Sequence, residues 1–135
     1  MMNPSLNTLV RDALISLDCD SSLIGDFDSH STINLDFDNM SSISISEIGG
    51  FVWMWSELCD DDDHLLKQVS FDLLALTCEP CAFMLAEHPV LYRHDGKLKV
   101  KAVVHPDYLE DSEMFAEALD GFFGKLTMLY ETVHR

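Results

Sequence analysis

The spacing of hydrophobic positions changes several times along this 135-residue chain, and each change predicts a new element. Over residues 4–18 the apolar residues recur with a 3.6-residue period. This spacing predicts an amphipathic helix with Asn3 as its N-cap and Pro4 at its first position. Residues 31–57 follow a two-residue period in three runs, which predicts three strands. Because the connections between them are short, the strands are expected to form an antiparallel meander.

The three runs differ in the number of faces that they can bury. The first two runs have one apolar and one polar face, and their apolar positions are Ile33, Leu35, Phe37, Ile43 and Ile45. The third run follows the hairpin signal Gly49-Gly50 and is apolar on both faces, with Trp53 and Trp55 on one of them. Both faces of this third strand are therefore expected to make contacts.

The second half of the chain alternates between the same two periods. The acidic run Asp60–Asp63 precedes an apolar stripe that ends before Pro80. This arrangement predicts a second helix whose N-terminus is stabilised by the carboxylates. Residues 87–104 then alternate again around Asp95-Gly96, a pair that favours a two-residue type I′ turn. A second hairpin is therefore predicted between the second and third helices.

A long amphipathic helix is predicted from Ser112 to Val133. Gly121 and Gly124 each weaken it by about 1 kcal/mol relative to alanine, which indicates a closely packed neighbour. The fold class is therefore α+β, with an antiparallel sheet and the order α-β-β-β-α-β-β-α. The length fits one domain over residues 1–135.

The charge of the chain restricts its partners. Asp and Glu total 24 and Lys and Arg total 8, so the formal net charge is −16. Binding to nucleic acid and docking to an anionic membrane both need cations, so both are disfavoured. The most apolar stretch, Phe71–Ala86, contains charged residues and a proline, so we expect no membrane insertion. The charge favours solubility, or a partner with basic or apolar segments.

The four cysteines are expected to be free thiols in a reducing cytoplasm, because Arg11 and Asp12 interrupt any N-terminal signal peptide. Cys78 and Cys81 have the CxxC spacing of a redox or zinc site. They lie at a predicted helix C-terminus, however, where the dipole raises the pKa of a thiol. A zinc site would also need two further ligands at a suitable spacing.

Two other clusters contain the residue types of catalytic or metal sites. Asp60–Asp63 with His64 lacks the alternate spacing and the glycine of a calcium loop. Asp28-Ser29-His30 contains the residue types of a hydrolase triad, but adjacent in sequence and without a nucleophile elbow. We therefore expect no enzyme, no catalytic residue, no metal and no cofactor. The enzyme alternative that stays open is a thiol oxidoreductase that uses Cys78 and Cys81.

Several segments resemble the InvB/SpaK family of class I type III secretion chaperones. They are Leu9–Leu14, Ser22–Ile24, Asp28–Ile33, Val52–Trp55 and Lys101–Leu109. The resemblance covers nearly the whole chain. It implies a cytoplasmic bacterial homodimer that holds the N-terminal segment of a secreted effector extended, soluble and secretion-competent. It also implies service to several effectors, presentation of the effector to the export ATPase, and no bound nucleotide.

An extended effector segment can add a strand to an open sheet edge, while apolar anchors supply most of the binding energy. We expect these anchors to contact nine apolar residues: Leu14, Leu17, Ile24, Ile33, Leu35, Ile43, Ile45, Trp53 and Trp55. The competing interpretation is that half or more of the nine are core residues, because each strand must bury one face.

The second helix is the expected dimer contact. The resemblance supports the helix, and the apolar period selects its residues, which are Leu66, Val69, Leu73 and Leu76. A function of another class stays open beside the chaperone. In that alternative the chain is a small dimeric adaptor domain that recognises a folded signalling partner.

Overall fold

A computed structural model describes residues 5–19 and 32–135 of the chain. The elements, in order, are α1 (Leu6–Ser16), β1 (Ile33–Leu35), β2 (Ile43–Ile48), β3 (Phe51–Asp60), α2 (Asp63–Cys78), β4 (Val90–His94), β5 (Lys97–Val103), the 3-10 helix η2 (Pro106–Leu109) and α3 (Ser112–Val133). The α+β class and the predicted order are confirmed. The 3-10 helix η2 is an addition that the sequence pattern did not predict.

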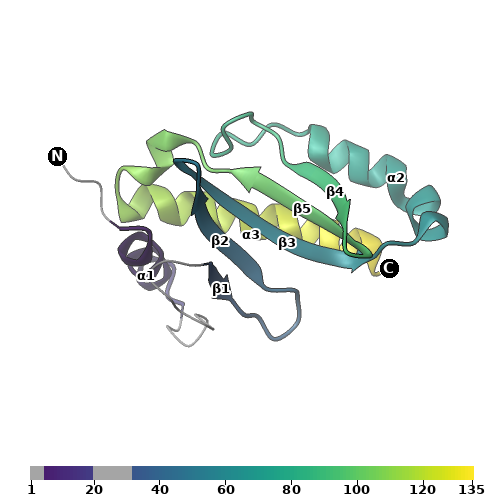
Figure 1. Cartoon of the computed structure of the whole chain (residues 1–135), viewed down its shortest axis with the longest axis horizontal. Coiled ribbons are helices and arrows are strands. Elements are labelled where there is room, and N and C mark those ends of the chain that lie inside the picture. The colour runs from purple at the N-terminus through teal and green to yellow at the C-terminus, as the bar shows by residue number, and fades with distance from the viewer. Residues whose placement is uncertain (1–4, 20–31) are drawn as a thin grey trace.

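The five strands form one antiparallel sheet with the order β1-β2-β3-β5-β4 (Figure 1). β1 and β4 are its edge strands. The two hairpins turn at Gly49-Gly50 and at Asp95-Gly96, where φ is 60° and 84° and then 53° and 72°. A type I′ turn needs positive φ at both central positions, so both predicted two-residue turns are confirmed.

The two faces of the sheet have different environments. On one face the side chains of Ile43, Ile45 and Met54 are fully buried, and the core continues onto α1 and α3. Figure 1 shows α3 running along the back of the sheet, with α1 beside it near β1 and α2 beyond β4. No helix lies in front of the sheet in this view of the described residues. We call the two sides the helix-covered face and the outer face.

Gly121 of α3 lies where the chain needs a residue without a side chain. A Cβ built there would lie 2.5 Å from the ring of Phe83, which packs across the helix. A Cβ at Gly124 would meet nothing within 4 Å among the described residues. Close packing therefore explains the first glycine, as predicted, and does not explain the second.

Some predicted boundaries were wrong. α1 begins at Leu6, with the Ser5 side chain accepting a hydrogen bond from the Thr8 N–H at 3.3 Å; Asn3 and Pro4 lie outside the described residues. β1 ends at Leu35, two residues before Phe37. Phe37 lies beyond the end of β1, and its ring packs on Phe123 of α3.

The acidic run Asp60–Asp63 is divided between the end of β3 and the start of α2. Asp60 is the last residue of β3 and forms an ion pair with Lys97 of β5, so pairing with β5 extends β3 beyond its predicted end. Asp62 is the N-cap of α2, and its side chain accepts a hydrogen bond from the His64 N–H at 2.9 Å. The prediction that carboxylates stabilise this helix start is therefore correct for only part of the run.

Candidate binding sites on the two faces of the sheet

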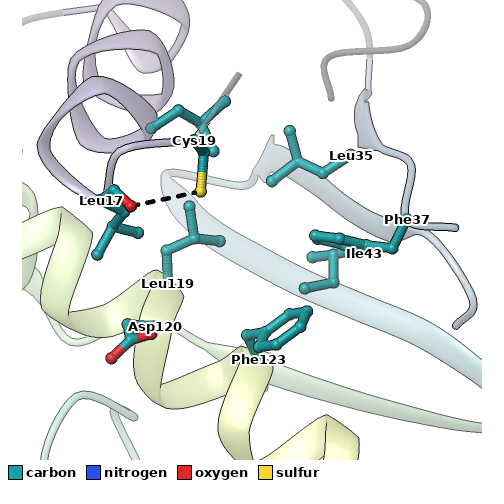
Figure 2. A pocket seen from close by; sticks show the side chains of 9 residues that line it. Leu17, Cys19, Leu35, Phe37, Ile43, Leu119, Asp120 and Phe123 are labelled. Atoms are coloured by element: carbon teal, nitrogen blue, oxygen red, sulfur yellow. Dashed lines mark hydrogen bonds between the residues drawn. The ribbon is translucent and has the colours of Figure 1, made fainter. Parts of the chain in front are cut away.

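An apolar pocket of about 180 Å³ opens between the end of α1, the strands β1 and β2, and α3. Its lining residues are Leu14, Leu17, Cys19, Leu35, Phe37, Ile43, Leu119, Asp120 and Phe123. Figure 2 shows Leu17 and Cys19 on one side, Leu35, Phe37 and Ile43 on the other, and Leu119 and Phe123 of α3 below them. A cavity of about 150 Å³ holds a benzene molecule, so this pocket has room for one large apolar side chain.

The walls and the mouth of the pocket differ in exposure. Leu14, Leu35 and Ile43 are between 0% and 3% exposed and form fixed walls. Leu17 is half-buried, and Phe123 is 37% exposed. The rings of Phe37 and Phe123 have their centroids 5.0 Å apart and are tilted by 52°, a favourable aromatic geometry. A ligand would therefore meet an apolar interior behind a partly aromatic rim.

The structure separates the nine predicted effector-binding residues into groups. Leu14, Leu17, Leu35 and Ile43 line the pocket. The side chains of Ile33 and Ile45 are fully buried in the core. Trp53 and Trp55 lie on the outer face, and Ile24 lies outside the described residues. The pocket and the two tryptophans therefore lie on opposite faces of the sheet, so they do not form one continuous binding site.

Helix α3 contributes Leu119, Asp120 and Phe123 to the pocket, and the apolar pattern did not predict any of the three as binding residues. A usable signal existed at Phe123, because it follows Phe122 and lies off the buried stripe. A large aromatic residue beside the stripe of an otherwise covered helix indicates a partly exposed apolar site.

The outer face of the sheet carries a second apolar surface. A shallow hollow of about 340 Å³ is lined by Ile48, Trp53, Trp55, Tyr92 and Lys101. Trp55 pairs with Lys101 across β3 and β5, so the residues come from neighbouring strands. The Lys101 ammonium lies 4.5 Å from the ring centroid of Tyr92 and 5.5 Å from that of Trp53, which is cation–π distance.

The second helix presents apolar side chains to solvent. Val69 and Leu73, which are 6% and 3% exposed, pack in the core. Phe71 and Leu74 are 79% and 60% exposed. Of the four predicted dimer residues, Leu66 and Leu76 are half-buried and therefore partly available to a partner. The most exposed apolar residues of α2 are thus the two that its sequence stripe left out.

Cys78 is exposed, whereas Cys59 and Cys81 are half-buried. Cys78 is the last residue of α2, and Cys81 follows in the turn after it. Burial raises the pKa of Cys81, and Lys125 opposes this rise only in part. Burial, followed by the charges of Asp60 and Asp61, also raises the pKa of Cys59. A raised pKa disfavours the thiolate that redox chemistry needs.

Two further findings concern the described residues alone. Within residues 5–19 and 32–135, no three His, Cys, Asp or Glu side chains are grouped so that they could hold a metal ion. In the same ranges, no helix combines the length and the apolar character that a membrane span requires.

The fold agrees with the comparisons to known proteins. The chain belongs to the invasion protein B family, whose model matches residues 18–95. The resemblance to InvB/SpaK type III secretion chaperones is confirmed. The surface presentation of antigens protein SpaK from Salmonella typhimurium is 40% identical to this chain over 135 residues, which is 100% of both chains. The protein of the same name from Salmonella typhi has the same identity and coverage.

Two solved structures share the fold at low sequence identity. A chain from the HopA1–SchA chaperone–effector complex is 19% identical, with a TM-score of 0.57 and coverage of 93% of this chain and 92% of the other. YbjN from E. coli is 17% identical, with a TM-score of 0.60 and coverage of 95% and 90%. At these identities the likeness supports the fold and not a shared ligand.

Proposed function

We propose that this type III secretion chaperone binds the N-terminal segments of several secreted effectors, and that an apolar anchor of each effector enters the pocket between α1, β1, β2 and α3. The observation that supports this most strongly is the pocket itself. It is apolar, partly open, and lined by Leu35 of the edge strand β1. Full burial of one Leu-sized or Phe-sized side chain there would contribute about 1.5–3 kcal/mol.

The edge strand next to the pocket supports the proposal that one chaperone serves different effectors. β1 has β2 on one side and, among the described strands, no partner on the other. An extended segment that pairs with such an edge gains main-chain hydrogen bonds whatever its side chains are. Only the anchor must then be apolar and of suitable size, so varied effector sequences can be accepted.

We further propose that the chain works as a homodimer through α2. The exposed Phe71 and Leu74, together with half-buried Leu66 and Leu76, would form the contact. Val69 and Leu73 would support the helix from inside the subunit. A dimer carries two pockets, so an effector segment that reaches both gains affinity through a high effective concentration.

The remaining expectations belong to the same proposal. The 135 residues would act as one domain in the bacterial cytoplasm, without catalysis, cofactor, nucleic acid or membrane insertion. The export ATPase would be a later partner of the loaded chaperone. The raised pKa of Cys81 is consistent with a binding protein rather than a thiol oxidoreductase.

The test is a matched pair of substitutions on α3. Phe123→Ala removes the rim of the pocket, and Met128→Ala removes an apolar side chain that is 49% exposed and does not line the pocket. We expect Phe123→Ala to weaken binding of an effector N-terminal peptide by about tenfold, equivalent to about 1.4 kcal/mol. We expect Met128→Ala to bind like the unmodified chain. Calorimetric titration gives the dissociation constants.

Two results would contradict the proposal. Equal binding by both variants would remove the pocket from the effector site. Binding of a folded partner, with no binding of the extended peptide, would favour the adaptor domain instead. Native mass spectrometry of the complex tests the dimer in the same samples.

A further inference from the structure

We propose that the outer face of the sheet is a second docking surface, and that it takes a segment of another protein in which a carboxylate lies between apolar side chains. The surface consists of Ile48, Phe51, Trp53, Trp55, Tyr92 and Lys101. It is independent of the effector pocket, because strand side chains alternate between faces and these residues point away from the helix-covered face.

The apolar side chains of the surface come from three strands, β2, β3 and β4. Ile48 pairs with Phe51 at the β2–β3 hairpin, and these side chains are 55% and 47% exposed. Trp53 and Trp55 follow on the same face of β3, and Val90, which is 51% exposed, extends the surface onto the edge strand β4. Contiguous exposed apolar patches of this kind on a protein surface mark interaction sites.

The charge of the surface identifies the chemistry of the partner. Three lysines alternate along β5, and two of them have acidic partners: Lys97 pairs with Asp60, and Lys99 lies 4.0 Å from Glu57. Lys101 is different. Across residues 5–19 and 32–135 it has no carboxylate within ion-pair distance, and its ammonium lies over the rings of Tyr92 and Trp53.

The rings attract the Lys101 ammonium but leave its charge in place. A partner carboxylate beside this half-buried ammonium would form a charge-assisted hydrogen bond in a partly desolvated site. Apolar side chains on either side of the carboxylate would cover the tryptophans and exclude water from that bond.

The overall charge makes this surface selective. The formal net charge of the chain is −16, so most of its surface repels an acidic segment. On the outer face, two neighbouring residue pairs of β3 and β5 are Trp55 with Lys101 and Glu57 with Lys99. Their charged side chains give this part of the face a local charge of +1. An acidic segment would therefore be directed to this face. A symmetric contact between two copies centred here would instead bring the two Lys101 side chains together.

The test can use the fluorescence of the chain's own tryptophans. Its two tryptophans, Trp53 and Trp55, both lie on the outer face, so intrinsic tryptophan fluorescence reports this surface. A displayed library of random 12-residue peptides would be selected on the full chain and on two charge-reversed variants. Lys101→Glu reverses the proposed contact. Lys97→Glu is the matched control, because it makes the same change on the same face of β5, four residues away.

We expect the unmodified chain and the Lys97→Glu variant to enrich peptides with Asp or Glu between apolar residues. Enrichment of these peptides on Lys101→Glu should fall at least tenfold. In fluorescence titrations, the consensus peptide should shift tryptophan emission and bind at least fivefold more tightly than its amide analogue. This preference should vanish in Lys101→Met, which keeps the aliphatic stem and removes the charge.

Three outcomes would overturn the inference. One is selection of peptides without acidic residues, and another is equal selection on Lys101→Glu in a sample that circular dichroism shows to be folded. The third concerns the chain without any peptide. In this outcome, tryptophan emission changes as the protein concentration rises, a dimer forms over the same range, and Trp55→Ala abolishes that dimer. That result would assign the outer face to a second copy of the chain. The effector-pocket titrations do not depend on any of these outcomes.

Discussion

The two faces of the sheet are built from the same strands but differ in how far their side chains are buried. On β3, Met54 is fully buried beneath the helices, while its neighbours Trp53 and Trp55 stay half-buried on the outer face. The helix-covered face is mostly buried, and its apolar pocket has room for a single side chain. The outer face is shallow, aromatic and carries lysines. A closed face can select a partner by the shape of one anchor, whereas an open face selects by surface chemistry.

The strongest way to test this comparison is a pair of substitutions at adjacent positions of β3. Met54→Ala should lower the free energy of unfolding by about 2–5 kcal/mol, because it leaves a cavity in the core. Trp55→Ala should cost less than half of that, because its side chain is only partly buried. Urea unfolding followed by circular dichroism measures both. A larger loss for Trp55→Ala would show that the outer face is as well packed as the core.

A second pair tests how tightly the far side of α3 is packed. Gly121→Ala should destabilise the protein by about 1–3 kcal/mol through overpacking against Phe83. Gly124→Ala should instead stabilise it by up to about 1 kcal/mol, because alanine is the better helix former and space is free. Thermal unfolding gives the opposite signs directly. The same sign for both variants would contradict the close approach of Phe83.

The smallest effect is expected at the end of the outer face, where Asp60 meets Lys97. The hydrogen bond from Lys97, and then its charge, lower the pKa of Asp60 from its ordinary value of 3.8. A carboxylate with a lowered pKa stabilises the folded state above its unfolded pKa, and this contribution is lost as the pH falls through the folded value. The side chains of Lys97 and Asp60 are 40% and 82% exposed, so solvent screens the pair.

Asp60→Asn should therefore lower the unfolding temperature slightly at pH 7, and this difference should shrink towards pH 2 as the carboxylate takes up a proton. Thermal unfolding at both pH values measures this. Asp38→Asn, at an exposed acid without an ion-pair partner among the described residues, is the control. An equal effect at both pH values would show that the substitution acts through something other than the charge.

Local pattern predicted most of the elements. The change from a 3.6-residue to a two-residue period located each helix and strand, and α3 begins and ends as predicted. The errors occur where a tertiary partner outweighed the local signal. Asp60 forms an ion pair with Lys97 and belongs to β3, and Phe37 packs on Phe123 and lies outside β1. Neither partner is near in sequence, so no local rule could have included it.

The candidate site was only partly predictable for the same reason. Periodicity identifies which residues are apolar and share one face, and it therefore found Leu14, Leu17, Leu35 and Ile43. It cannot tell a covered position from a pocket wall, which separates Ile33 and Ile45 from those four. It also could not assign Trp53 and Trp55 to the opposite face of the sheet, because register depends on pairing between strands.

By itself, the sequence determined the α+β order, the two hairpin turns, the excess of acidic charge and the family resemblance. These properties depend on neighbouring residues, on composition, or on residue identity along the chain. Only the tertiary structure decided which apolar residues meet across α1, β1, β2 and α3, and that Lys101 lies over aromatic rings without a carboxylate partner among the described residues. Those features depend on how elements distant in sequence pack together, because burial and electrostatics act through space.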